Sequence, residues 1–227
     1  MLKEIYEQPK AIRDTLTGRI SKDNKDVIFE ELGWEPADVA SVNRILITAC
    51  GTAYHAGLVA KYYIEQLARI PVEVDIASEY RYRDPLTDKN TLAIVISQSG
   101  ETSDTLAALK EAKRRGARSL AVTNVVGSSI AREADQVIYT WAGPEIAVAS
   151  TKAYTTQLVA LLLLAVYIGK LNGKLDAALA EKILTDLHEL PTLCNEIFET
   201  VDDIKAFAKT TVSVKMRSSW AVPSTMP

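Results

Sequence analysis

Leu92-Ala93-Ile94-Val95-Ile96-Ser97-Gln98-Ser99-Gly100-Glu101-Thr102 is the most informative stretch of the chain. Its apolar, partly β-branched first half is typical of a buried strand, the small polar residues after it are typical of a tight turn, and a helical pattern follows to Arg115. Such a turn points backbone N–H groups and the positive end of a helix dipole at one position, where hydroxyl groups add further donors. Two interpretations stay open at this point: an anion site that uses no lysine or arginine, or a helix N-terminus without a ligand.

The same strand, turn and helix order occurs earlier in the chain. Residues 44–50 form an apolar run, Gly51-Thr52 predicts a second tight turn, and a helical pattern extends from Ala53 to Arg69. Further strands are predicted at Pro71–Ile76, Arg118–Thr123 and Gln136–Thr140. A short helix or turn is predicted at Ser78–Arg83, and a short helix at Ser128–Ala134.

This alternation predicts an α/β fold in which a doubly wound, parallel, five-stranded sheet lies between helices in three layers. Ligands of such sheets bind outside the carboxyl ends of the strands. Because Gly51-Thr52 and the turn at 97–102 both follow strands, we expect them to share one pocket. The strand order cannot be read from the sequence.

Helices are predicted on both sides of this domain. Residues 1–40 form a leader with a helix near Met1, disturbed by Pro9 and ended by Gly18, and a second short helix at Val27–Leu32. After the domain at 41–172, residues 173–209 are expected to be helical. The predicted helices are Lys152–Leu171, Leu175–Leu190 and, after an interruption at Pro191, Thr192–Lys209. We expect them to serve as packing or oligomer surface.

The composition narrows the function classes. The chain has 227 residues and a net charge of −3, and without a basic stripe it is not expected to bind nucleic acid. Cys50 and Cys194 lie far apart and make no metal-ligand spacing with His55 and His188, so we expect neither a metal site nor a cofactor. Few cysteines and no signal peptide favour the cytoplasm. The apolar run Leu158–Ile168 is too short for a bilayer and predicts a buried helix.

The sequence does not contain the motifs of dinucleotide, nucleoside triphosphate or hydrolase sites. The residues after the first strand lack the Gly-x-Gly-x-x-Gly spacing of a dinucleotide site, the triphosphate motif is absent, and no Gly precedes Ser97 as in a hydrolase elbow. His55 has no paired nucleophile, which disfavours a role as a base. Cys50 is expected to be a small buried residue, and Glu101 to occupy the first turn of its helix, where the dipole favours a carboxylate.

The tail from 210 to 227 departs from the rest of the chain. It combines Ser, Thr, Pro, Met and Trp without periodicity. Codons can be chosen for Lys215–Pro227 that, read in a shifted frame, encode a strand-like segment followed by a Gly-Arg turn. We therefore hypothesise that this tail is a frameshift product, an idea that the coding DNA tests directly.

Several motifs together resemble one family. The turn at 97–102 resembles the phosphosugar-binding turn of the SIS (sugar isomerase) domain, whose fold is flavodoxin-like. Four further stretches extend the resemblance, over about residues 1–209, to the glucosamine-6-phosphate synthases, which are glutamine–fructose-6-phosphate transaminases (isomerizing). These stretches are Met1-Leu2-Lys3-Glu4-Ile5-Tyr6-Glu7-Gln8-Pro9, Ala49-Cys50-Gly51-Thr52, Ala77-Ser78-Glu79-Tyr80-Arg81-Tyr82-Arg83 and Val148-Ala149-Ser150-Thr151-Lys152-Ala153.

The resemblance implies a sugar phosphate, fructose 6-phosphate or glucosamine 6-phosphate, as the ligand. It implies that Ser97, Gln98, Ser99 and Thr102 hold the phosphate, and that Thr52, Val148 and Ser150 contact the sugar. Two small departures, Ala53 for the family's usual Ser and Ala147 for its common Gly, leave the assignment standing.

The chain is similar to the inter-domain leader plus the first of two SIS units. The family's catalytic Glu, His and Lys, and its glutaminase Cys, have no counterpart here, so no catalytic residue is assigned and the fragment is expected to be catalytically incomplete. The family also implies a homodimer, to which the helix at 152–171 is expected to contribute. The alternatives are a stand-alone SIS module that senses a phosphosugar, and a structural fragment that folds poorly alone.

Overall fold

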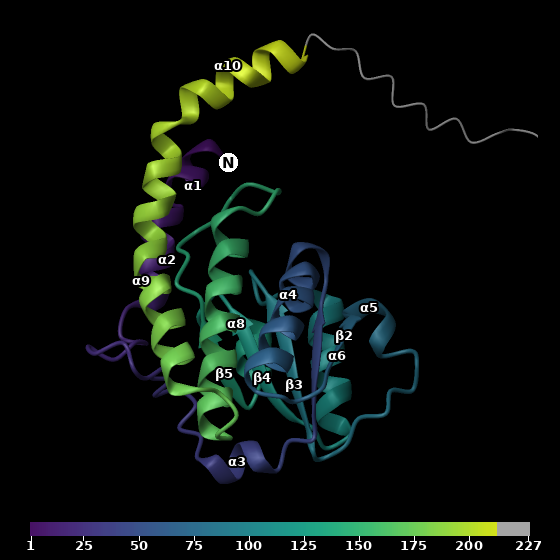
Figure 1. Ribbon diagram of the computed structural model, residues 1–227. Coiled ribbons are helices and arrows are strands. Elements are labelled where there is room, and N and C mark those ends of the chain that lie inside the picture. Colours follow the sequence, from purple (N-terminus) through teal and green to yellow (C-terminus); the bar gives the residue numbers. More distant parts are fainter. Residues whose placement is uncertain (213–227) are drawn as a thin grey trace, which may run out of the picture.

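The computed structural model describes residues 1–212 and contains one parallel sheet in the order β2-β1-β3-β4-β5 (Figure 1). Its strands are β1 (Arg44–Ala49), β2 (Val72–Ile76), β3 (Thr91–Ser97), β4 (Arg118–Thr123) and β5 (Gln136–Tyr139). All four neighbouring pairs are parallel, and β3 is buried along its whole length. The predicted strands and the doubly wound fold are confirmed, and the order is that of flavodoxin-like sheets.

Helices cover both faces of the sheet. The helices up to the fifth strand are α1 (Leu2–Tyr6), α2 (Gln8–Leu16), α3 (Pro36–Ala40), α4 (Gly51–Leu67), α5 (Ala77–Tyr80), α6 (Ser103–Arg114) and α7 (Ser129–Glu133). Those after it are α8 (Lys152–Leu171), α9 (Ala177–Glu199) and α10 (Val201–Val212). One face of the sheet packs on α4 and α8 in the main core, and the other on α5, α6 and α7. Outside α8, α2 and α9 add a further partial layer.

The helix α8 is the centre of the main core. It is long and apolar enough to cross a membrane by length and composition, but most of it is buried inside the protein, as in the core helix of a globular domain. The buried helix predicted from the apolar run Leu158–Ile168 is confirmed. The neighbours of α8 are α4, α2 and α9, and its contribution to a dimer stays a prediction. The exposed apolar side chains at this end of the chain belong to α9 and α10: Leu179, Leu193, Ile197, Ile204 and Phe207.

Two expectations for the flanks are wrong. Residues 27–32 are not helical: an antiparallel bridge joins Ile20 to Val27, and Val27 and Phe29 are both buried. An extended segment directs these alternate residues to the same side, whereas a helix would direct them apart. Pro191 lies inside α9, which continues to Glu199, and the break falls at Thr200 instead.

The sequence predicts that the last helix ends at Lys209. In the structure this helix, α10, continues to Val212. The frameshift hypothesis for Lys215–Pro227 concerns a segment outside the described residues.

Candidate functional site

The turn after β3 is held by its own hydroxyl groups. Ser97 Oγ, almost fully buried, accepts a hydrogen bond of 3.0 Å from the Gly100 N–H and lies 3.1 Å from Thr102 Oγ1. Ser99 Oγ accepts a 3.2 Å hydrogen bond from the Glu101 N–H. These bonds fold residues 97–102 back on themselves and keep the hydroxyl groups together at the start of α6.

Gly100 allows this turn to pack against the next strand. Its φ is +66°, which L side chains rarely adopt, and a Cβ here would overlap the Ser128 hydroxyl and lie 2.9 Å from Thr123 Oγ1. The Gly100 carbonyl accepts a 2.9 Å hydrogen bond from the Ile130 N–H. The turn is therefore fixed from behind, by residues that follow β4, as well as from within.

Two helix N-termini open toward the same space. The N-cap residues are Cys50 for α4 and Thr102 for α6, and neither side chain makes a capping hydrogen bond. The N–H groups of a first helical turn have no partner within the helix, and the dipole favours an anion there. Because strand order reverses between β1 and β3, the two turns face one crevice, as expected for this topology.

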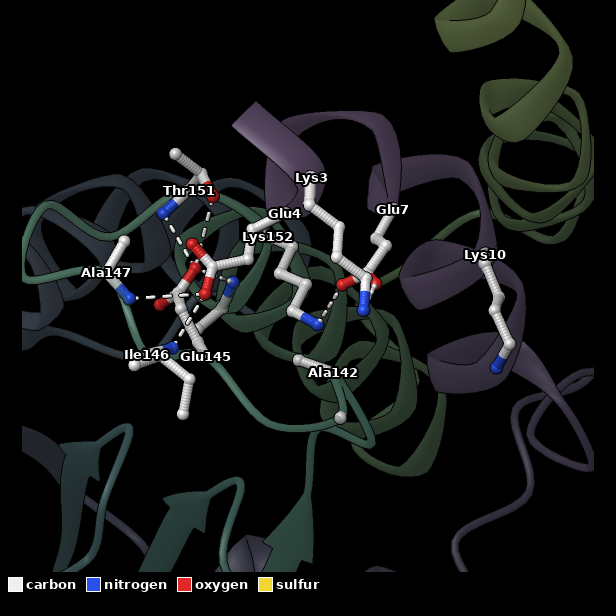
Figure 2. A network of polar contacts seen from close by, with 12 residues as sticks. Lys3, Glu4, Glu7, Lys10, Ala142, Glu145, Ile146, Ala147, Thr151 and Lys152 are labelled. Atoms are coloured by element: carbon white, nitrogen blue, oxygen red, sulfur yellow. Dashed lines mark hydrogen bonds and ion pairs between the residues drawn. The ribbon is translucent and has the colours of Figure 1, made fainter. Parts of the chain in front are cut away.

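A third wall comes from the loop between β5 and α8. Val148 is fully exposed there, and Ser150 Oγ donates a 2.9 Å hydrogen bond to Glu145 Oε2. Glu145 Oε1 accepts hydrogen bonds from the N–H groups of Thr151 at 2.8 Å and Ala153 at 3.2 Å. The N-cap residue of α8, Thr151, makes no side-chain capping hydrogen bond, and the Glu145 carboxylate binds the N–H groups there instead (Figure 2).

These three walls enclose a cavity of about 470 Å³. All the predicted ligand-contacting residues line it: Thr52, Ser97, Gln98, Ser99, Thr102, Val148 and Ser150. Gly51, expected from the sequence in the shared pocket, also lines it, as do six residues not assigned to the site from sequence: Cys50, Ala53, Ile96, Glu145, Ala147 and Gln157. The predicted pocket shared by the two turns is therefore present.

A larger cavity of about 730 Å³ lies between α2 and the loops after β4 and β5. Its lining includes Asp14, whose carboxylate would repel an anion. The smaller cavity, with its two uncapped helix N-termini, is the better candidate for an anionic ligand.

Gln157 is the most informative residue that the sequence analysis missed. It lies on α8, is only 3% exposed, and lines the cavity, yet no donor among the described residues reaches its Oε1. Buried amides nearly always have hydrogen-bond partners. Its position in the apolar pattern of α8 gave no signal for this role.

Three other residues, His55, Cys50 and Glu101, were considered for a chemical role on the basis of the sequence. His55 is exposed on α4 with its ring against Tyr54. Cys50 is half-buried at the cavity, with its Sγ 3.9 Å from Thr105 Oγ1. Glu101 precedes the first turn of α6 instead of lying in it, and its carboxylate accepts a 2.8 Å hydrogen bond from the Ser129 N–H. The hydrogen bonds from Ser129 hold the pKa of Glu101 below its ordinary value.

Known proteins that share one name match most of this chain. Residues 38–167 match the model of the SIS domain. The glutamine–fructose-6-phosphate aminotransferase (isomerizing) of Symbiobacterium thermophilum is 58% identical over 209 residues, which are 92% of this chain and 34% of that protein. The same-named protein of Clostridium tetani is 58% identical over 211 residues, 93% of this chain and 34% of that protein.

A solved structure extends the comparison to the fold. The C-terminal domain of glucosamine-fructose-6-phosphate aminotransferase from Francisella tularensis matches with a TM-score of 0.84 and 40% identity, over 91% of this chain and 57% of that chain. The chain spans about a third of the length of the curated relatives it matches. It belongs to the SIS-domain family, and its sequence and fold match the C-terminal isomerase region of the glutamine–fructose-6-phosphate aminotransferases.

Proposed function

We propose that the cavity binds a hexose phosphate, fructose 6-phosphate or glucosamine 6-phosphate, with the phosphate at residues 97–102 and the sugar against Thr52, Val148 and Ser150. The observation that carries the proposal is the meeting of two uncapped helix N-termini and several hydroxyl groups in one cavity. Such a site holds a phosphate through hydrogen bonds and dipoles and requires no lysine or arginine.

The names of the relatives support this choice of ligand, since they denote enzymes that act on fructose 6-phosphate. In this proposal the chain supplies the phosphosugar-binding part of such an aminotransferase. Assembly as a homodimer and a cytoplasmic location belong to the same proposal, and the exposed apolar side chains of α9 and α10 offer a surface for assembly.

The phosphate-binding role is tested by Ser99→Ala and Thr102→Val. Each variant removes a hydroxyl that lines the cavity, and a lost hydrogen bond to a charged group weakens binding roughly tenfold or more. We expect fructose 6-phosphate to raise the Tm of the unaltered protein, and each variant to reduce that shift strongly. Titration calorimetry gives the matching change in Kd.

Thr185→Ala is the control, because the Thr185 hydroxyl is exposed on α9 and bonds only locally, to the Glu181 carbonyl. It should leave the ligand-induced shift intact. If neither fructose 6-phosphate nor glucosamine 6-phosphate changes the Tm of the unaltered protein, the proposed function is wrong.

Gln157→Leu should weaken sugar binding without harming the fold. The amide offers a partner to a sugar hydroxyl, so its removal should raise the Kd for fructose 6-phosphate roughly three- to tenfold. Removing a buried, unpaired amide oxygen should leave the free energy of unfolding unchanged or increase it by up to about 1 kcal/mol. Calorimetry and urea denaturation measure the two effects.

Gln66→Leu is the matched control, since Gln66 is an exposed helical glutamine on α4. It should change neither quantity. Unaltered affinity in Gln157→Leu, alongside normal binding by the unaltered protein, would show that Gln157 does not contact the ligand.

A further inference from the structure

The leader contacts the loop that forms the third wall of the cavity. Glu4, on α1, is a buried carboxylate, and its Oε1 accepts hydrogen bonds from the backbone N–H groups of Ile146 at 2.7 Å and Ala147 at 3.1 Å. Ala147 itself lines the cavity, next to Val148. One carboxylate from the start of the chain thus binds the backbone of the sugar-side loop (Figure 2).

Two more side chains of the leader hold the start of α8. Glu7 Oε2 lies 2.6 Å from the Nζ of Lys152, a lysine that is only 3% exposed, and Thr155 Oγ1 donates a 2.6 Å hydrogen bond to Gln8 Oε1. A cation in the first turn of a helix is unfavourable for the dipole, so Lys152 depends on the Glu7 carboxylate. The loop is therefore attached to the leader at its middle, through Glu4, and at its end, through Glu7 and Gln8.

The Glu4 contact is electrostatically strong. The amine of Met1 and the N–H groups of Ile146 and Ala147 lower the pKa of Glu4 to about 2, so the carboxylate is charged at neutral pH. Hydrogen bonds to a charged acceptor are stronger than neutral ones. The side chains of Ile146 and Val148 are exposed and give the loop little apolar anchoring of its own. The loop therefore depends on polar contacts, from Glu4 on one side and from Glu145 on the other.

We propose that Glu4 is a positioning residue of the cavity: it holds residues 146–148 in place, so that the leader sets the affinity of the site for the sugar part of a ligand. This inference rests on the proposed function for its binding readout. The turn at 97–102 is fixed separately, by Ser97, Gly100 and the residues after β4. Loss of the Glu4 contact should therefore affect recognition of the sugar and leave recognition of the phosphate unchanged.

The experiment compares Glu4→Ala and Glu4→Gln with the unaltered chain. Hydrogen exchange at the Ile146 and Ala147 amides should become about tenfold faster or more in Glu4→Ala, because both amides lose their acceptor. Glu4→Gln keeps a neutral acceptor oxygen and should fall in between. The Kd for fructose 6-phosphate should rise roughly three- to tenfold in Glu4→Ala, and the Kd for inorganic phosphate should stay the same.

Glu30→Gln is the control, because it removes a negative charge from an exposed position of the same leader. It should alter neither exchange nor binding. Equal exchange of the two amides in all proteins would overturn the inference, as would an equal loss of affinity for both ligands. If the unaltered chain binds no sugar phosphate, the proposed function fails, and the exchange measurement alone then decides whether Glu4 positions the loop.

Discussion

Gly100→Ala is expected to destabilise the protein by about 2–4 kcal/mol and to abolish binding of a sugar phosphate. The backbone at Gly100 has a φ of +66°, and the added methyl group would lie 2.5 Å from Ser128 Cβ. The turn cannot stay in place with that side chain, because Ser128 is itself buried. Urea denaturation measures the free energy of unfolding, and calorimetry with inorganic phosphate measures the site.

Gly33→Ala separates the two contributions. Gly33 has a φ of +56°, but nothing lies within 4 Å of the Cβ that an alanine would add. Its expected cost is that of the backbone conformation alone, about 1–2 kcal/mol, and phosphate binding should be unaffected. An equal cost at both positions would mean that the contact between Gly100 and Ser128 carries no constraint.

Gly169→Ala should destabilise the protein by about 1–3 kcal/mol. Gly169 lies near the end of α8, and a Cβ there would be 2.6 Å from the carbonyl oxygen of Leu67, the last residue of α4. Backbone atoms cannot rotate out of the way as a flexible side chain can, so the two helices must move apart. The cavity is lined by the first turn of α4, by the loop before α8 and by Gln157 on α8. Because moving α4 and α8 apart would displace these residues, we also expect the ligand to raise the Tm by less.

The sign of the change in the free energy of unfolding of Gly169→Ala decides whether the close contact between α4 and α8 constrains the fold. Within a helix, alanine is favoured over glycine by about 1 kcal/mol when no contact opposes it. A more stable Gly169→Ala protein in urea denaturation would therefore show that α4 and α8 tolerate greater separation than their close contact indicates.

The local sequence predicted the sheet and the hydroxyl-rich turn at 97–102 for a physical reason. In 92–102 the strand, turn and helix signals follow one another without conflict, and the hydroxyl groups act within a few residues of where they stand. The prediction that this turn and Thr52 line the same pocket rests on topology, because both turns follow parallel strands at the same edge of the sheet.

Contacts between segments that lie far apart in the chain could not be predicted from the local sequence. Residues 27–32 have apolar residues that suit a short helix, yet Phe29 and Trp34 pack on the Tyr167 ring of α8, with ring centroids 5.5 and 6.1 Å away. Pro191 predicted a break, but α9 has buried Leu184 and Leu187 before the proline and, after it, Phe198 against Tyr6. Tertiary packing outweighs the local preference in both places.

The cap that Glu145 provides for α8 gives the cavity a polarity. The N-cap side chains of α4 and α6 make no capping hydrogen bond, whereas the N–H groups at the start of α8 bind the Glu145 carboxylate. We therefore expect the side of the cavity formed by the strand ends to be more favourable to an anion than the side formed by the 145–150 loop. On this expectation, a ligand with a dianionic head and a neutral body would enter with its head toward the strand ends before any hydrogen bond forms.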